Sequence, residues 1–262
     1  MITRTLPRFG TRRSLYIFER NFMVYRSQWL MLISGFFEPL FYLLSIGIGL
    51  NHLVGNVTVG GRVISYAAFV APGMLATSAM NGAVIDSVFN TFFRLKISHT
   101  YDAVLATPLD VADVALGEVW WALARATIYA ASFIVCMVLL GDSGSAWVVL
   151  CWPAAILTSL AFSCVGLAAC TYMRSWQDFD MVALVQLPIF LFSATFFPIT
   201  FYPRWLGALI TISPLYQSAT LLRGLALGQF QWIMVLHVGY LIALSLIALT
   251  VANHRFRRIL VP

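Results

Sequence analysis

The sequence is poor in charged residues. Only 10% of its 262 residues are Asp, Glu, Lys or Arg, whereas soluble domains carry roughly 25%. Hydrophobic residues make up 61%, and the mean hydropathy is +0.87. Water is therefore not the main solvent of this chain. The composition predicts an all-α integral membrane protein, because an open strand in lipid would leave its backbone polar groups unpaired.

Nucleotide-binding and catalytic motifs are also missing. A P-loop has the pattern GxxxxGK[ST], and the single lysine, Lys96, follows leucine instead of glycine. The four histidines form no HExxH-like pair, and the four cysteines lie in apolar stretches without CxxC spacing. We therefore expect no ATPase site, no catalytic residues, no metal site and no cofactor in this chain.

The few charges gather near the two ends. Six arginines precede residue 28, three lie between 255 and 258, and the net charge is +6. Arginines that flank apolar spans indicate cytoplasmic segments, so anionic membrane lipid is the expected partner and nucleic acid is not. We expect no cleavable signal peptide, and the first span would act as its own insertion signal.

Six segments are long and apolar enough to cross roughly 30 Å of hydrocarbon, which takes about 20 residues. The predicted spans are 29–50, 64–90, 112–140, 146–172, 181–199 and 230–252. An even number of spans leaves both arginine-rich termini in the cytoplasm. The sequence therefore predicts a single multi-pass transmembrane domain over 1–262, in the cell (plasma or inner) membrane.

The stretch 200–229 is apolar but interrupted. It contains Pro203, Arg204, Trp205, Pro214, Tyr216 and Arg223. Each piece is too short to cross the membrane, since residues 204–213 cover only about 15 Å as a helix. We expect two short re-entrant helices at the extracellular face, buried in protein as such backbone must be.

An amphipathic helix is predicted over 11–28, before the first span. Its apolar residues recur at spacings of three and four: Leu15, Phe18, Phe22 and Tyr25. Charged residues occupy most of the remaining surface, which suits a helix lying in the membrane interface. The alternative is that this segment extends the first span into the cytosol.

The link between the second and third spans predicts a short cytosolic helix over 99–106. Capping residues precede it and Pro108 follows it. Exposed Tyr101, Val104 and Leu105 would be costly unless a cytosolic partner covers them. The alternative is a loop packed against its own helix ends.

Several ionisable residues lie within the predicted spans. Glu118, Trp121 and Arg125 share one face of the third span. Glu118 and Arg125 are about 10 Å apart along the helix, too far for an ideal direct pair. Glu38 and Asp86 are further candidates for a polar translocation path. The alternative for Glu118 is that it reaches the cytosolic interface, and the asparagines near Asp86, Asn81 and Asn90, are expected to serve structural hydrogen bonds.

Several motifs resemble those of one transporter family. They are Tyr101-Asp-Ala-Val-Leu-Ala-Thr-Pro-Leu109, Leu116-Gly-Glu-Val-Trp120, Phe197-Pro-Ile-Thr-Phe-Tyr-Pro-Arg-Trp205, Ser213-Pro-Leu-Tyr216 and Arg223-Gly224. With the order of predicted helices, they resemble the ABC type-2 exporter permeases, especially the nodulation-factor and daunorubicin exporter branches. The resemblance covers nearly the whole chain.

The resemblance implies an ATP-driven export complex. Two permeases, identical or paralogous, would pair with two nucleotide-binding subunits that hold ATP and Mg. The implied contacts with the ATPase are Tyr101, Asp102, Val104, Leu105 and Pro108. The implied substrates are lipids, glycolipids, lipid-linked polysaccharides or amphipathic drugs, moved out of the cytoplasm.

Two other functions remain open from the residues alone. A proton-coupled secondary transporter could use Glu38, Asp86 and Glu118, although we find no clear internal repeat such as the inverted repeats of many carriers. A small membrane transferase or assembly factor would need reactive side chains that converge at one interface. The scattered histidines do not indicate such a site.

Overall fold

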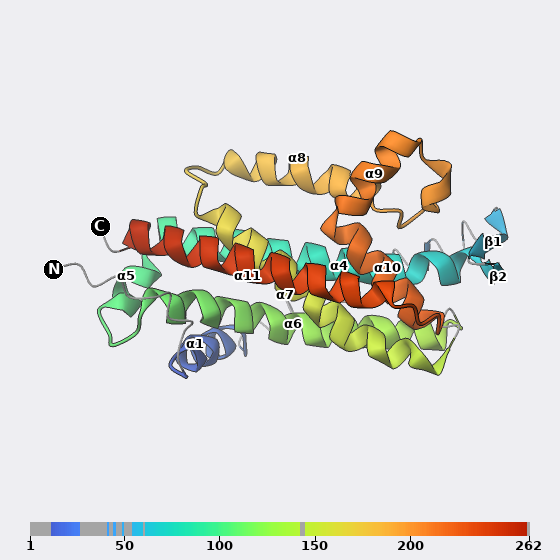
Figure 1. The fold of residues 1–262 in the computed structure, drawn as a ribbon. Helices are drawn as coiled ribbons and strands as arrows, with labels where there is room; N and C mark the ends of the chain where they lie inside the picture. The colour runs from blue at the N-terminus through green and yellow to red at the C-terminus, as the bar shows by residue number, and fades with distance from the viewer. Residues whose placement is uncertain are drawn as a thin grey trace.

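The computed structural model describes residues 12–26, 41, 44–45, 49, 54–59, 61–141 and 145–260. The predicted first span, 29–50, lies almost wholly outside these residues, as does Glu38. Within them, the structure is a bundle of long helices with one small hairpin (Figure 1). The predicted all-α membrane character therefore holds for the spans that can be described.

Four helical segments are long and apolar enough to cross a membrane. They are Tyr66–Ile97, Val111–Leu139, Ala146–Cys170 and Ile233–Leu260. These correspond to the predicted second, third, fourth and sixth spans. The first of them is α4 (Tyr66–Ile85), which continues as the π-helical turns η2 (Asp86–Asn90) and η3 (Phe93–Ile97). The others are α6 (Val111–Leu139), the 3-10 turn η4 (Ala146–Leu150) with α7 (Cys151–Cys170), and α11 (Ile233–Leu260).

Side-chain caps fix where two of these helices begin. Ser65 accepts a hydrogen bond from the Ala68 backbone N–H at 3.2 Å and so starts α4. Asp110 and Asp113 form a reciprocal capping box at the start of α6. Each cap satisfies backbone N–H groups that have no partner within the helix.

A two-stranded antiparallel hairpin precedes α4. β1 (Asn56–Val59) pairs with β2 (Arg62–Ser65), with Val57 opposite Ile64. The β-branched residues of these strands favour extended backbone, and Gly61 has the positive φ of 79° that a tight turn requires. The helix therefore begins at Tyr66, two residues after the predicted start of the second span at 64.

The predicted fifth span, 181–199, forms only in part. The helix α8 covers Asp178–Leu191, which is about 21 Å and short of the roughly 30 Å of a bilayer core. It ends before Ala194, whose φ is +53°, where the Ser193 and Thr195 hydroxyls hydrogen bond at 2.7 Å. The six-span layout therefore stays a prediction.

The region 200–229 folds as two short helices. η5 (Ile199–Phe201) leads to α9 (Arg204–Ile212) and α10 (Pro214–Ala226). Pro203 is the N-cap of α9, and Pro214 opens α10 at its first turn, where a missing N–H costs nothing. The two prolines thus set the boundaries of the helices. Their re-entry into the membrane stays a prediction.

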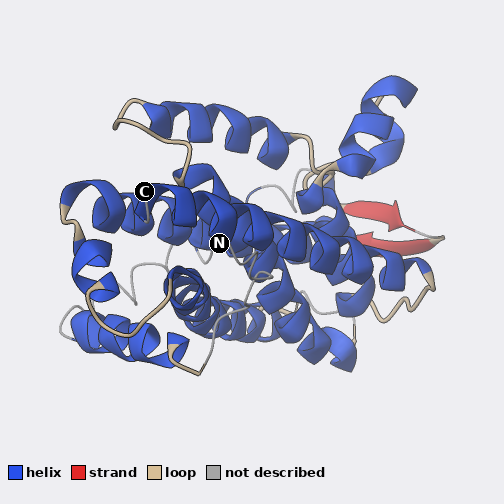
Figure 2. Cartoon of the chain, turned by 60° about the vertical axis from the view of Figure 1, so that its left-hand side comes forward, coloured by secondary structure: helices blue, strands red, loops and turns tan. Residues whose placement is uncertain are grey.

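The central helix α7 packs against α4, α6, α10 and α11, so it lies inside the bundle. Figure 2 shows the helices gathered in one bundle, with the two strands at one end of it. Close approach depends on small residues. A side chain at Gly166 of α7 would collide with Ser87 of η2. Cys151, Cys164 and Cys170 are buried as free thiols, as expected for small apolar residues.

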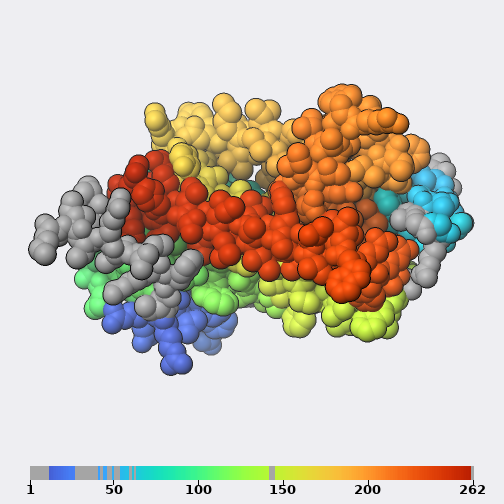
Figure 3. All heavy atoms as spheres, viewed as in Figure 1, coloured from blue at the N-terminus to red at the C-terminus, as the bar shows by residue number. Residues whose placement is uncertain are grey.

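The bundle has two distinct ends (Figure 1). We call one the α5 end: it carries the short helix α5 (Thr100–Leu105), the nearby helix α1 (Ser14–Arg26) and the last turns of α11. We call the other the hairpin end: it carries β1, β2, α9 and α10. The space-filling view shows an opening between α8 and the residues that follow it (Figure 3).

Candidate functional site

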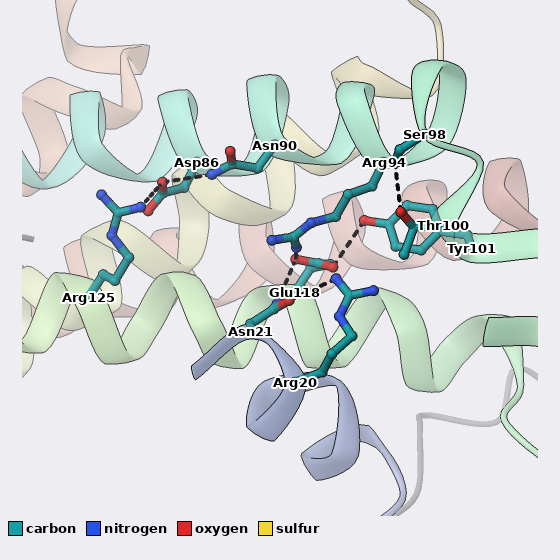
Figure 4. A network of polar contacts seen from close by, with 10 residues as sticks. All are labelled: Arg20, Asn21, Asp86, Asn90, Arg94, Ser98, Thr100, Tyr101, Glu118 and Arg125. Carbon is teal, nitrogen blue, oxygen red and sulfur yellow. Dashed lines mark hydrogen bonds and ion pairs between the residues drawn. The ribbon is translucent and has the colours of Figure 1, made fainter. Parts of the chain in front are cut away.

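A buried carboxylate, Glu118 of α6, is the centre of a polar network at the α5 end (Figure 4). It is 7% exposed and forms an ion pair with Arg94 of η3. The same carboxylate accepts hydrogen bonds from the Tyr101 hydroxyl of α5 at 3.0 Å and from the Asn21 side-chain amide of α1 at 3.1 Å. One side chain therefore holds four elements together.

This arrangement follows from the way charge is buried. A carboxylate removed from water is stable only if it is paired and fully hydrogen bonded, and Glu118 has a cation and two neutral donors. Arg94 reaches it from η3, where the helix is π-helical. Such local widening is frequent at functional sites.

A second ion pair lies further along the same helices. Arg125 of α6 pairs with Asp86 at the start of η2, and it donates to the Tyr129 hydroxyl at 2.9 Å. Asn90 donates to the same Asp86 carboxylate at 3.2 Å. The guanidinium also lies 5.5 Å from the centre of the Tyr25 ring of α1. As the spacing predicted, Arg125 does not pair with Glu118.

The helix α1 docks on α6 through a face that the sequence did not indicate. Its buried residues are Ser14, Ile17, Asn21 and Tyr25. Of the predicted apolar stripe, only Tyr25 is buried: Leu15 and Phe22 are 53% and 55% exposed, and Phe18 is partly buried. The docked face is closely fitted, because a Cβ at Gly117 of α6 would collide with Ile17.

Trp121 of α6 anchors this contact. Its ring lies 4.9 Å from the ring of Tyr25 and 5.9 Å from that of Phe18, measured between centroids. Trp121 therefore packs against α1. Leu15 and Phe22 point away from the protein, so their contact with lipid stays a prediction.

The expectation that Tyr101 is exposed is wrong. Its side chain is 1% exposed, packs edge-on against Phe256 of α11 at 6.1 Å, and donates to Glu118. Burial, followed by the Glu118 carboxylate, raises the pKa of Tyr101 well above its usual value of 10.0. The hydroxyl therefore stays protonated and remains a donor at neutral pH.

The other predicted coupling residues divide between surface and interior. Asp102 of α5 and Pro108 after it are exposed, whereas Val104 and Leu105 are partly buried against the cluster that contains Tyr101. The Pro108 carbonyl accepts a hydrogen bond from Arg13 at 2.7 Å, and Arg257 of α11 pairs with Asp110 at 2.9 Å. The α5 segment is thus fastened to the bundle on its inner side and open on its outer side.

Sequence reasoning missed two members of the network. Arg94 was not among the predicted site residues, and Asn21 lies outside the predicted apolar stripe of α1. The available signal for Asn21 was a polar residue at helical spacing from Ile17 and Tyr25, which are both large and apolar. Arg94 gave no such signal, because its pairing depends on how two separate spans pack.

An apolar cavity of about 610 Å³ lies between α4, α7 and α8. Most of its lining is aliphatic or aromatic, with Arg174 and Asp178 near one end and Gln186 among the polar exceptions. Gln186 donates to Asn81 at 2.7 Å. The cavity is large enough for a drug-sized or acyl-chain ligand.

The predicted extracellular residues divide between surface and interior. Arg204 and Trp205 of α9 are exposed, whereas Tyr216 and Arg223 of α10 line a second cavity at the hairpin end. Among the described residues, no group of His, Cys, Asp and Glu could hold a metal ion. Candidate chemistry in the described part of the chain is therefore ionic and hydrogen-bonding.

The sequence of the chain is similar to that of known proteins. Residues 13–227 match the family described as ABC-2 type transporter. Similar proteins include Nodulation protein J of Rhizobium leguminosarum bv. trifolii, 32% identical over 95% of this chain and 94% of that protein. The protein of the same name from Rhizobium leguminosarum bv. viciae is 31% identical over 97% of both chains. The chain therefore belongs to the ABC-2 type transporter family.

Proposed function

We propose that this chain is the permease of an ATP-driven exporter and that α5 is its docking element for a separate nucleotide-binding subunit. Family membership supports the transport role, and the sequence contains no P-loop of its own. The observation that carries the proposal is the hydrogen bond from Tyr101 of α5 to Glu118 of α6. It links the inner face of α5 directly to the membrane helix α6.

The proposed coupling runs through contacts that exist between named side chains. A partner that presses on Asp102, Val104 and Leu105 would move α5 as a unit. Tyr101 would carry that displacement to Glu118, which also holds α1 and η3. ATP and Mg would be held by the partner, and two copies of the permease, or this chain and a paralogue, would open a path between them.

The proposed substrate is a lipid, glycolipid, lipid-linked polysaccharide or amphipathic drug. The apolar cavity that α8 lines would accommodate the acyl or aromatic group of such a substrate. The few polar residues in its lining would contact the polar end of the same molecule. We place the chain in the cell (plasma or inner) membrane with both termini and α5 in the cytoplasm. The arginine clusters support this orientation.

The competing function, proton-coupled transport, is less well supported. It needs a carboxylate that can gain and lose a proton during the cycle. Asp86 and Glu118 each form an ion pair with an arginine and accept further hydrogen bonds that join helices. Glu38 lies outside the described residues. A structural role accounts for both described carboxylates.

The proposal is tested by co-purification with candidate ATPase subunits and by ATPase assays in lipid nanodiscs. Leu105→Asp places a charge at the end of α5, and because Leu105 is partly buried against the bundle, Asp102→Arg at an exposed residue of α5 is tested beside it. We expect both variants to lose the ATPase partner and partner-dependent ATP hydrolysis, and thermal unfolding of each is measured in parallel. Val63→Asp is the matched control, because Val63 is 68% exposed at the hairpin end.

The outcomes separate the two functions. Retention of the partner by wild type and Val63→Asp, with loss in Leu105→Asp, supports docking through α5. A folded wild-type protein that recruits no ATPase and moves substrate under a proton gradient overturns the proposal. Equal partner binding by Leu105→Asp and wild type would remove α5 from the interface.

A further inference from the structure

Arg223 of α10 is a buried cation held by backbone oxygens. It is 9% exposed, and its Nε and Nη2 donate to the carbonyls of Phe69 and Ala194, each at 3.0 Å. The guanidinium carbon lies 3.9 Å from the centre of the Phe69 ring. Among the described residues it has no carboxylate partner, in contrast to Arg94 and Arg125.

A cavity of about 270 Å³ adjoins this guanidinium. Hydrogen-bonding side chains contribute much of its lining, including Thr58, Tyr216, Thr220, Gln229, Gln231 and His237. None of its lining residues is Asp or Glu. Its electrostatic character is therefore positive, and within the described residues nothing neutralises it.

His237 of α11 faces the same cavity from a different helix. It is 5% exposed, and its Nδ1 is hydrogen bonded to the Gln217 side-chain oxygen. Its other ring nitrogen, Nε2, is buried and has no hydrogen-bond partner among the described residues. A buried polar atom without a partner is costly, so a ligand that bonds to it would be stabilised.

We propose that this cavity is a binding site for a phosphate-type oxyanion. Arg223 leaves Nη1 without an acceptor among the described residues, because its hydrogen bonds there use Nε and Nη2. The guanidinium donates to an oxyanion. Because His237 Nδ1 donates to the Gln217 oxygen, Nε2 of the neutral ring is an acceptor, and it accepts a hydrogen bond from the hydroxyl of a monoprotonated phosphate group. At about 270 Å³ the site is below the roughly 300–1,000 Å³ of drug-sized pockets, so it fits a headgroup and not a whole lipid.

Occupancy would bridge several elements of the hairpin end. The lining residues come from β1, α4, the segment after α8, α10 and the start of α11. An oxyanion between Arg223 and His237 would hold the ends of α10 and α11 together. The site is independent of ATPase docking, which takes place at the opposite end of the bundle.

The test measures binding of three soluble probes to the full-length chain in a neutral detergent, by isothermal titration calorimetry. The probes are dihexanoylphosphatidate, inorganic phosphate and dihexanoylglycerol, which has the same acyl chains without phosphate. We expect saturable binding of dihexanoylphosphatidate and none of dihexanoylglycerol. If inorganic phosphate also binds, the site takes a free oxyanion. If dihexanoylphosphatidate binds and inorganic phosphate does not, the ligand is a lipid headgroup.

Two variants locate the site. His237→Gln removes the free ring nitrogen and is expected to weaken binding about tenfold, the value of one charge-assisted hydrogen bond. Thr220→Phe fills the cavity and is expected to abolish binding. Arg204→Gln, which removes an exposed arginine from α9 at the same end, is expected to bind like wild type.

The proposal is overturned if no phosphate-bearing probe binds saturably. It is also overturned if dihexanoylglycerol binds as tightly as dihexanoylphosphatidate, or if His237→Gln and wild type bind equally. Thermal unfolding of each variant is measured in parallel. If Thr220→Phe does not fold, His237→Gln alone decides the result.

Discussion

The two ends of the bundle bury arginine in different ways. At the α5 end, Arg94 and Arg125 each pair with a carboxylate, and neutral donors complete the shell of that carboxylate. At the hairpin end, Arg223 is held by backbone carbonyls beside a cavity. Paired charges fix helices to one another, whereas a cation without a counter-charge is available to a ligand.

The difference in partners should also be a difference in stability. A buried ion pair that loses one partner leaves an uncompensated charge, which costs more than the pair itself contributes. A cation that is removed from carbonyl oxygens leaves only neutral groups behind.

Glu118→Ala is expected to have the largest effect. It leaves Arg94 buried without a partner and removes the acceptor of Tyr101, at a cost of about 3–5 kcal/mol in unfolding free energy. Unfolding can be followed with a thiol-reactive dye, because three of the cysteines are buried. Glu19→Gln, an exposed change on α1, is the control. A loss equal to that control would show that the network is not structural.

Arg223→Met is expected to cost less, about 1–3 kcal/mol, because neutral carbonyls and no charge are left unpaired. The same dye measurement applies, with Arg204→Met as the exposed control. A loss larger than that of Glu118→Ala would reverse the comparison. It would assign Arg223 the stronger structural role.

Tyr101→Phe isolates one hydrogen bond of the network. The ring and its contact with Phe256 remain, so the expected loss is about 0.5–1.5 kcal/mol. Tyr16→Phe, on an exposed residue of α1, should leave the melting temperature unchanged. Identical melting of both variants would mean that the hydroxyl contributes nothing to the α5 end.

The titration of Tyr101 is expected to have the smallest effect on stability. Near neutral pH it should have none. Because burial raises the pKa of Tyr101 in the folded state, its stabilising contribution is complete below the unfolded value of about 10. Above that pH the unfolded state loses its proton first, so stability falls. Wild type should therefore lose more stability than Tyr101→Phe between about pH 9 and pH 11. Parallel curves would contradict the raised pKa.

The sequence predicted the long spans well because apolar length is a local property. The four helices found long enough to cross match predicted spans to within a few residues, apart from the π-helical extension to Ile97 and the continuation of α11 to Leu260. The hairpin before Tyr66 was missed because an apolar, β-branched run reads equally well as the start of a span. The end of α8 at Leu191 was missed because apolar residues continue beyond it.

The site was less accessible to sequence reasoning because its contacts join distant segments. Glu118 and Asp86 were recognised as unusual charges, but their partners, Arg94 and Arg125, are fixed by the packing of α6 against η2 and η3. The docked face of α1 depends on Gly117, which admits Ile17. Periodicity alone favoured the more apolar stripe.

The central claim is that α5 acts on the membrane helices through the contact between Tyr101 and Glu118. The most direct test is a double-mutant cycle on the ATPase rate of the assembled complex in nanodiscs, with Tyr101→Phe, Glu118→Gln and the double variant. We expect the two reductions in ATPase rate to overlap, so that the double variant is little slower than the slower single variant. A double variant whose rate is reduced by the product of the two single reductions would contradict coupling through this contact.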